Sequence, residues 1–265
     1  MKSHCKIFEV RKIITGSSMR LKNILFMCLT FLLTSCSNNA PDPKMLVLGT
    51  DPTYPPYESI SADGQCEGFD IDVAKAIAKK LNKTLVIKQF GFTALILALK
   101  QNKVDLVLAG MSITPSRTKE IDMLPYQGEP LTSLYLAFWG EKPSRAPSLT
   151  DLDTIAVMIG TFEENHLRKT PQITCKSLEN TTEILLDLQY KKSEAPLFEP
   201  KVAMLLQKKF PELQLIEVPL EEKDWSIGKG IGMNKTNSLL IEQVRLSLEE
   251  LREDGTLQQL EQKWM

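Results

Sequence analysis

The chain has few of the residues that metal and redox chemistry require. Its 265 residues include two histidines and five cysteines, and His166 is the only histidine beyond residue 35. The sequence contains no Cys-x-x-Cys pair and no histidine–cysteine cluster, whereas a structural zinc site needs such ligands at short spacing. We therefore expect no metal site.

A phosphate-binding loop is also missing. Glycine alternates with other residues over 228–233, but the run lacks the G-x-G-x-x-G spacing and completes no Gly-Lys-Ser/Thr sequence. We predict instead a strand whose glycines permit close packing. No cofactor is expected.

The whole chain has little excess charge of either sign, with a formal net charge of −1. Residues 1–35 bias this value, because they hold six basic residues and one acidic residue. The remainder has 26 basic and 32 acidic residues, a net charge of −6. An acidic chain argues against nucleic-acid binding, which needs a basic surface. It is compatible with a cationic ligand.

Long hydrophobic runs are scarce as well. The apolar run 24–33 follows a basic segment at 19–22 and is too short to span a bilayer. This pattern predicts that residues 1–35 are an export signal, with Met19 as an alternative start. The chain is then expected to be periplasmic or held at the cell envelope.

Residues 33–36, Leu-Thr-Ser-Cys, resemble the bacterial lipobox. The resemblance implies cleavage before Cys36 and lipidation of its thiol, and a plain signal peptide with an unmodified cysteine is the alternative. Residues 36–44 would form a short lipidated tether. Cys66 and Cys175 fall in segments that we assign to different lobes, so we expect both thiols to be free.

Strand and helix patterns alternate through the rest of the chain. This alternation predicts an α/β fold with mostly parallel sheets and helices on both faces. Expected strands cover 45–50, 84–88, 104–108, 134–139, 155–158, 195–198 and 228–233, and expected helices cover 73–81, 93–100, 181–190, 238–252 and 257–264.

The stretch 109–117 is the strongest candidate for a binding site. Gly110 follows a predicted strand and lets a ligand approach the main chain, and Ser112 adds a hydroxyl. Thr114 before a proline predicts a helix start. Arg117 then lies near that start, where its guanidinium could hold a ligand carboxylate with two hydrogen bonds. The alternative is a surface ion pair with Glu120.

Three residues that follow other predicted strands are candidate ligand contacts, but each could instead have a structural role. Asp51 follows a strand end, where open α/β sheets bind ligands, or it closes a turn. Phe92 forms a pocket wall or part of the core. Thr161 caps a helix, and the free backbone N–H groups there could also bind an anion.

Four motifs, taken together, resemble the polar amino-acid-binding proteins of ABC importers, which form family 3 of the solute-binding proteins. They are GTDPTY at 49–54, GFDID at 68–72, SIT at 112–114 with Arg117, and EDGT at 253–256. The segment 109–115 is most similar to the arginine-binding branch. The resemblance implies a two-lobed periplasmic-binding-protein-like fold, with lobe 1 at 45–136 plus 226–265, lobe 2 at 137–225, and two crossing strands.

The resemblance also implies the roles of the site residues. The ligand's α-carboxylate would lie against Arg117, Ser112 and backbone N–H groups, and Glu199 would hold its α-ammonium. The family generally has aspartate in place of Glu199, which could otherwise cap a helix. Tyr54 and Phe92 would enclose the ligand side chain, and Asp51 would lie at its far end. The predicted ligand-binding set is Asp51, Tyr54, Phe92, Gly110, Met111, Ser112, Arg117, Thr161, Phe162 and Glu199.

The implied function is that of a monomeric binding component of an ABC importer. It would take a basic amino acid, most closely L-arginine, and present it to a membrane permease. A glutamine binder is an alternative with the same fold. An exported cyclohexadienyl or arogenate dehydratase, a sensor module and an adhesive surface protein would be different classes of protein. The binding protein is favoured over each of them, and we expect no enzyme.

Overall fold

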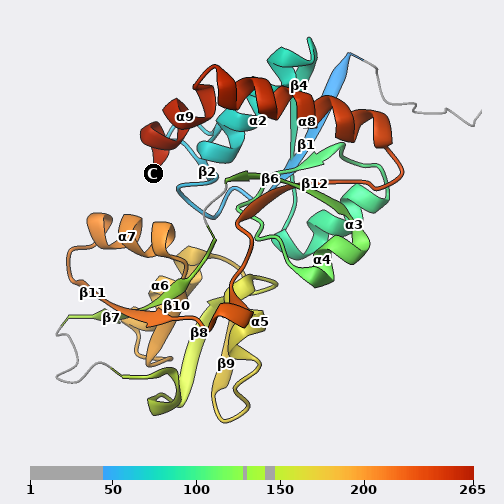
Figure 1. Cartoon of the computed structure of the whole chain (residues 1–265). Coiled ribbons are helices and arrows are strands. Elements are labelled where there is room, and N and C mark those ends of the chain that lie inside the picture. The colour runs from blue at the N-terminus through green and yellow to red at the C-terminus, as the bar shows by residue number, and fades with distance from the viewer. Residues whose placement is uncertain (1–43, 128–129, 141–146) are drawn as a thin grey trace, which may run out of the picture. The chain divides into compact units, whose positions relative to one another are not determined.

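The computed structural model describes residues 44–127, 130–140 and 147–265 (Figure 1). The expected signal peptide, the lipidation site Cys36 and the tether up to residue 43 lie outside these residues. Within the described ranges, no helix combines the length and the apolar character needed to cross a membrane.

One five-stranded sheet is built from both ends of the described chain. Its strand order is β4-β1-β5-β12-β6. β12 runs antiparallel to both of its neighbours, whereas β1 runs parallel to β4 and to β5. The strands are β1 (Met45–Thr50), β4 (Thr84–Gln89), β5 (Leu106–Val107), β6 (Asp122–Gln127) and β12 (Lys229–Met233). We call this sheet and its helices the first lobe.

A second five-stranded sheet repeats this plan with the order β11-β7-β10-β8-β9. Here β7 is the reversed strand, antiparallel to β10 and β11. The strands are β7 (Ser133–Trp139), β8 (Thr154–Met158), β9 (Thr174–Leu178), β10 (Ala195–Phe198) and β11 (Leu213–Pro219). This sheet and its helices form the second lobe. Each sheet is mixed but mostly of one direction, as the sequence predicts.

The chain changes sheet twice, between β6 and β7 and between β11 and β12. β7 pairs with β11 along its full length, from Ser133 opposite Pro219 to Trp139 opposite Leu213. The expected lobe boundary at residue 136 therefore falls inside a strand of the second sheet. The two crossing segments meet at an isolated bridge between Leu131 and Ser226.

Alternation along the strands explains why both faces of each sheet carry helices. In β8, Ile155 and Val157 join one buried cluster, and Ala156 and Met158 join another on the opposite face. Helices α6 (Thr181–Gln189) and α7 (Pro200–Lys209) bury apolar side chains in the cluster of Ala156, whereas α5 (Phe162–Leu167) buries Leu167 in the other.

The first sheet is covered in the same way. Leu106 of β5 joins the cluster formed by α2 (Phe69–Lys80), α8 (Ser238–Glu253) and α9 (Thr256–Trp264). Its neighbour Val107 joins the cluster of α3 (Leu95–Lys100) on the other face, where α4 (Pro115–Glu120) also lies (Figure 1). A small hairpin, β2 (Ser59–Ile60) with β3 (Cys66–Glu67), follows β1. Short 3₁₀ turns cover Phe92–Ala94, Leu149–Asp151 and Glu222–Asp224.

Candidate ligand-binding site

A small cavity lies where strand ends of the two sheets meet. Eight of the ten predicted site residues line it, and Asp51 and Met111 do not. Met111 is buried in the core beside α3 instead. The lining consists of Tyr54, Phe92, Ala109, Gly110, Ser112, Arg117, Met158, Thr161, Phe162, Glu163 and Glu199.

Arg117 is held by the start of α4, as the sequence predicts. Thr114 is the N-cap and its hydroxyl accepts from the Arg117 backbone N–H, with proline in the first turn. The guanidinium is buried and donates to the carbonyl oxygens of Ser112 (2.7 Å) and Gly160 (2.8 Å). It therefore joins the two lobes. The surface pair with Glu120 does not form: the Arg117 side chain is buried, and Glu120 pairs with Lys100.

The Arg117 guanidinium also lies over the Phe92 ring, 5.3 Å from its centre. Burial lowers the pKa of Arg117, and the carboxylates of Glu199 and Glu163 oppose this shift. A guanidinium has five N–H donors, and two of these are used by the carbonyl groups. The remaining donors leave this cation able to bind an anionic group in the cavity.

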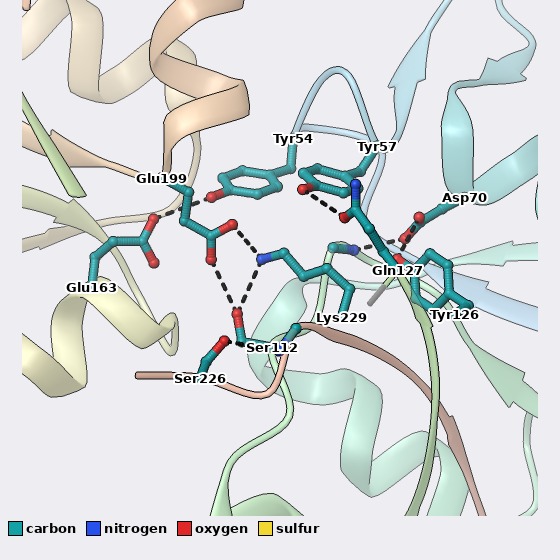
Figure 2. Close-up of polar contacts among 12 residues, drawn as sticks. Tyr54, Tyr57, Asp70, Ser112, Tyr126, Gln127, Glu163, Glu199, Ser226 and Lys229 are labelled. Carbon is teal, nitrogen blue, oxygen red and sulfur yellow. Dashed lines mark hydrogen bonds and ion pairs between the residues drawn. The ribbon is translucent and has the colours of Figure 1, made fainter. Parts of the chain in front are cut away.

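Glu199 supplies a buried carboxylate from the second lobe. It is the residue before α7, but its side chain makes no helix-capping hydrogen bond. Its carboxylate instead accepts from the Ser112 hydroxyl (3.0 Å) and forms an ion pair with Lys229. Figure 2 shows the Lys229 ammonium between Glu199 and Ser112. Glu199 therefore faces the site and does not cap the helix.

Glu163 is a second buried carboxylate that the sequence analysis missed. One of its oxygens accepts from the Tyr54 hydroxyl (3.1 Å), and the other has no hydrogen-bond partner (Figure 2). Burial, and then the neighbouring charge of Glu199, raise the pKa of Glu163 to about 7. A buried acceptor without a partner is costly, so this oxygen favours a ligand donor.

Asp51 closes a turn, which is the structural role that the sequence left open. Its carboxylate accepts from the Thr53 hydroxyl (2.9 Å) and from the Phe92 backbone N–H (2.8 Å). Burial raises the pKa of Asp51. Asp51 therefore positions Phe92, a wall of the cavity. Tyr54, the other predicted aromatic residue, stacks on Tyr57 with ring centres 5.9 Å apart.

Gly110 lies in the cavity wall, but its backbone N–H is already used. It donates to the Asp70 carboxylate at the start of α2 (2.7 Å), so the predicted ligand contact through this N–H is not available. Gly110 has φ of +53°, and a Cβ here would approach the ring of Tyr54 to 3.0 Å. Glycine is needed for this close packing. Asp70 also accepts from the Tyr126 hydroxyl (2.6 Å).

The turn before α5 supplies a wall from the second lobe beside Arg117, whose guanidinium donates to the Gly160 carbonyl. Thr161 is the N-cap of α5, its hydroxyl accepts from the Glu164 backbone N–H, and it donates to the Met158 carbonyl (2.7 Å). Its hydroxyl is therefore engaged, and the backbone N–H of Phe162 remains a candidate donor. The described residues contain no group of three histidine, cysteine or acidic side chains that could hold a metal ion.

Comparison with known proteins identifies the family of this chain. The model of the bacterial extracellular solute-binding proteins, family 3, matches residues 46–265. A probable ABC transporter arginine-binding protein, ArtJ, from Chlamydia trachomatis is 40% identical over 89% of this chain and 92% of its own length.

Solved structures extend the similarity to the fold. An ancestral arginine-binding protein bound to arginine aligns with a TM-score of 0.76 at 32% identity, over 84% of this chain and 98% of that one. An ancestral amino-acid-binding protein described as a precursor of cyclohexadienyl dehydratase aligns with a TM-score of 0.74 at 28% identity, over 83% and 95%. The chain thus belongs to family 3 of the bacterial extracellular solute-binding proteins.

Proposed function

We propose that this protein binds a basic amino acid, most closely L-arginine, between its two lobes and delivers it to an ABC importer. One observation carries the proposal: the cavity has a buried guanidinium on one side and two buried carboxylates on the other. An α-amino acid carries the complementary pair of charges on its α-carbon. A basic side chain adds a second cation, which suits the second carboxylate.

The ligand's α-carboxylate would bind Arg117 with the backbone N–H groups around Thr161 and Phe162. Its α-ammonium would bind Glu199 beside Ser112. These groups are common to all amino acids, so they would supply affinity without selecting the side chain.

The ligand side chain would lie against Tyr54 and Phe92. A guanidinium there would gain cation–π attraction of about 1–2 kcal/mol. Asp51 lies outside the cavity lining, and it would act only where a long side chain extends past Phe92; its carboxylate has acceptor capacity beyond the two bonds that it makes here. A neutral side chain such as that of glutamine would use neither attraction. The arginine binders among the relatives support the same choice.

Transport would follow from closure of the lobes. A ligand that contacts both lobes favours the closed state, and a permease can distinguish this state from the open one. Cys36 would carry the lipid that keeps a monomeric protein at the membrane surface. We expect no catalysis.

Calorimetric titration of the chain from Ser37 onward tests this proposal. The protein should first be unfolded and refolded to remove carried-over ligand, and then titrated with the twenty amino acids and ornithine. Arginine binding in the micromolar range or tighter is expected, with no turnover of prephenate or arogenate. If no amino acid binds, or if either dehydratase substrate is consumed, the proposal is wrong.

A further inference from the structure

A buried lysine on β12 lies beside Glu199, the residue that would bind the ligand's α-ammonium. Lys229 is the first residue of β12 and is only 5% exposed. The backbone fixes its place, because Gly230 donates to the carbonyl of Met111 (2.9 Å) and Ile113 donates to that of Gly228 (2.8 Å). This pairing sets Lys229 directly opposite Ser112.

The Lys229 ammonium has three partners within the protein. It forms the ion pair with Glu199, donates to the Ser112 hydroxyl (3.0 Å), and lies 5.2 Å from the centre of the Tyr57 ring (Figure 2). A buried ammonium without such partners would be strongly destabilising. The contacts account for a buried lysine, and they also link β12 of the first lobe to the start of α7 in the second.

Lys229 and the ligand would reach Glu199 from different sides. Glu199 lines the ligand cavity and also a neighbouring cavity with Tyr57 and Gln127. Lys229 lines only the neighbouring one. The lysine therefore leaves the ligand-facing side of the carboxylate free for a second cationic partner.

A glutamate at position 199 gains more from being held in place than the shorter aspartate would, because its side chain has one more rotatable bond. Each additional side-chain torsion must be fixed before the carboxylate can act as a preorganised acceptor, and fixing it costs conformational entropy. In the closed arrangement of the lobes, the bonds from Lys229 and Ser112 fix the Glu199 carboxylate in place for the ligand.

Lys229 also balances charge among the carboxylates. Glu163 and Glu199 are close enough that the charge of Glu199 raises the pKa of Glu163, and the charge of Lys229 opposes this rise. Without Lys229, two buried carboxylates would share Arg117 as their cation.

We propose that Lys229 is a positioning residue for ligand binding: it holds Glu199 from the side away from the ligand cavity, so that the carboxylate presents a fixed acceptor to the ligand's α-ammonium. This inference rests on the proposed function. Because Lys229 acts through Glu199, its effect on affinity should depend on the Glu199 charge.

A double-mutant cycle tests this dependence. Arginine affinity is measured by calorimetry at pH 8 on the full mature chain, for the wild type, Lys229→Met, Glu199→Gln and the double variant. Lys229→Met is expected to weaken binding tenfold or more. In the Glu199→Gln background the same change is expected to alter affinity less than threefold, because no carboxylate remains to be positioned. The double variant removes both members of the buried ion pair, so neither of these two charges is left without the other, and it should fold.

Lys235→Met is the matched control, since Lys235 follows β12, is exposed and donates only to the carbonyl of Lys119. It should bind arginine like the wild type. If Lys229→Met does not fold, Lys229→Gln replaces it, with the same expectation. The inference is wrong if Lys229→Met lowers arginine affinity equally in both backgrounds, or by less than threefold in the otherwise wild-type protein. In either case, arginine binding by the wild type would still support the proposed function. If the wild type binds no amino acid, both are wrong.

Discussion

The first lobe contributes Arg117 and Lys229 to the region around the cavity, whereas the second contributes Glu163 and Glu199. The cations come from the start of α4 and of β12, and the acids come from the start of α5 and the residue before α7. Bonds that cross between the lobes reflect this division, such as those from Lys229 to Glu199 and from Arg117 to the Gly160 carbonyl. The two halves therefore attract each other, and a zwitterionic ligand can bridge them.

Removing the Arg117 guanidinium should have the largest effect on ligand affinity. Arg117→Ala is expected to weaken binding of every amino acid at least a hundredfold, because it removes the common carboxylate anchor and one bond between the lobes. Calorimetric titration with arginine and glutamine checks this, with Arg245→Ala on the exposed face of α8 as the control. Retained affinity for either ligand contradicts the assigned pose.

Asp51 departs from this division, because it is an acid of the first lobe. Asp51→Asn is expected to weaken arginine binding about tenfold and glutamine binding less than threefold, since only the arginine side chain carries a charge. The ratio of the two affinities is the measurement. Equal losses would show that Asp51 acts only by holding the Phe92 backbone N–H.

The charge of Glu163 should have the smallest effect on arginine affinity, and this effect should depend on pH. Burial and the charge of Glu199 raise the pKa of Glu163 to about 7, so Glu163 is mostly protonated at pH 6 and mostly ionised at pH 8. A cationic ligand favours the ionised form, so arginine affinity should rise up to about tenfold over this interval. Lys229 and Tyr54 also face this group, and the Lys229 charge keeps the pKa from rising further.

Glu163→Gln provides the comparison for this pH dependence. Its arginine affinity should be nearly constant between pH 6 and 8. The wild type should bind like the variant near pH 6, where Glu163 is neutral, and more tightly than the variant toward pH 8. The raised pKa also means that ligand-free wild type loses more stability than the variant as the pH rises from 6 to 8. Parallel pH profiles of the two proteins would show that Glu163 does not cause the pH dependence of arginine binding.

Local sequence signals predicted those features whose causes lie within a few residues. The Thr114 cap, the proline after it and the apolar strands before the turns all have local causes, and the structure confirms them. The alternating glycines of β12 behave as expected, because a Cβ on Gly230 would meet Ile113 at 2.7 Å. Helix α2 begins at Phe69, four residues before the predicted start at Val73, because Asp70 and Asp72 interrupt the apolar pattern in its first turn.

Long-range pairings explain what the sequence could not predict. Lys229 lies 30 residues from Glu199 and 117 from Ser112 along the chain, and the Gly110 amide binds an acid 40 residues away. Glu163 follows a helix cap, where an acidic residue is typical for reasons of the helix dipole alone, so its position gave no sign of a ligand. Strand β9 is absent from the predicted strands, because its residues are exposed or only partly buried and show no strong alternation of polar and apolar side chains.

A titration with L-arginine and L-citrulline tests the central claim most directly. The two molecules have the same length and the same α-carbon groups, and they differ mainly in the charge of the side-chain end. The opposed charges of the two lobes predict that refolded, ligand-free protein binds arginine at least ten times more tightly than citrulline at pH 8. Equal affinities, or tighter binding of citrulline, would contradict the claim that this cavity is built for a cationic amino acid.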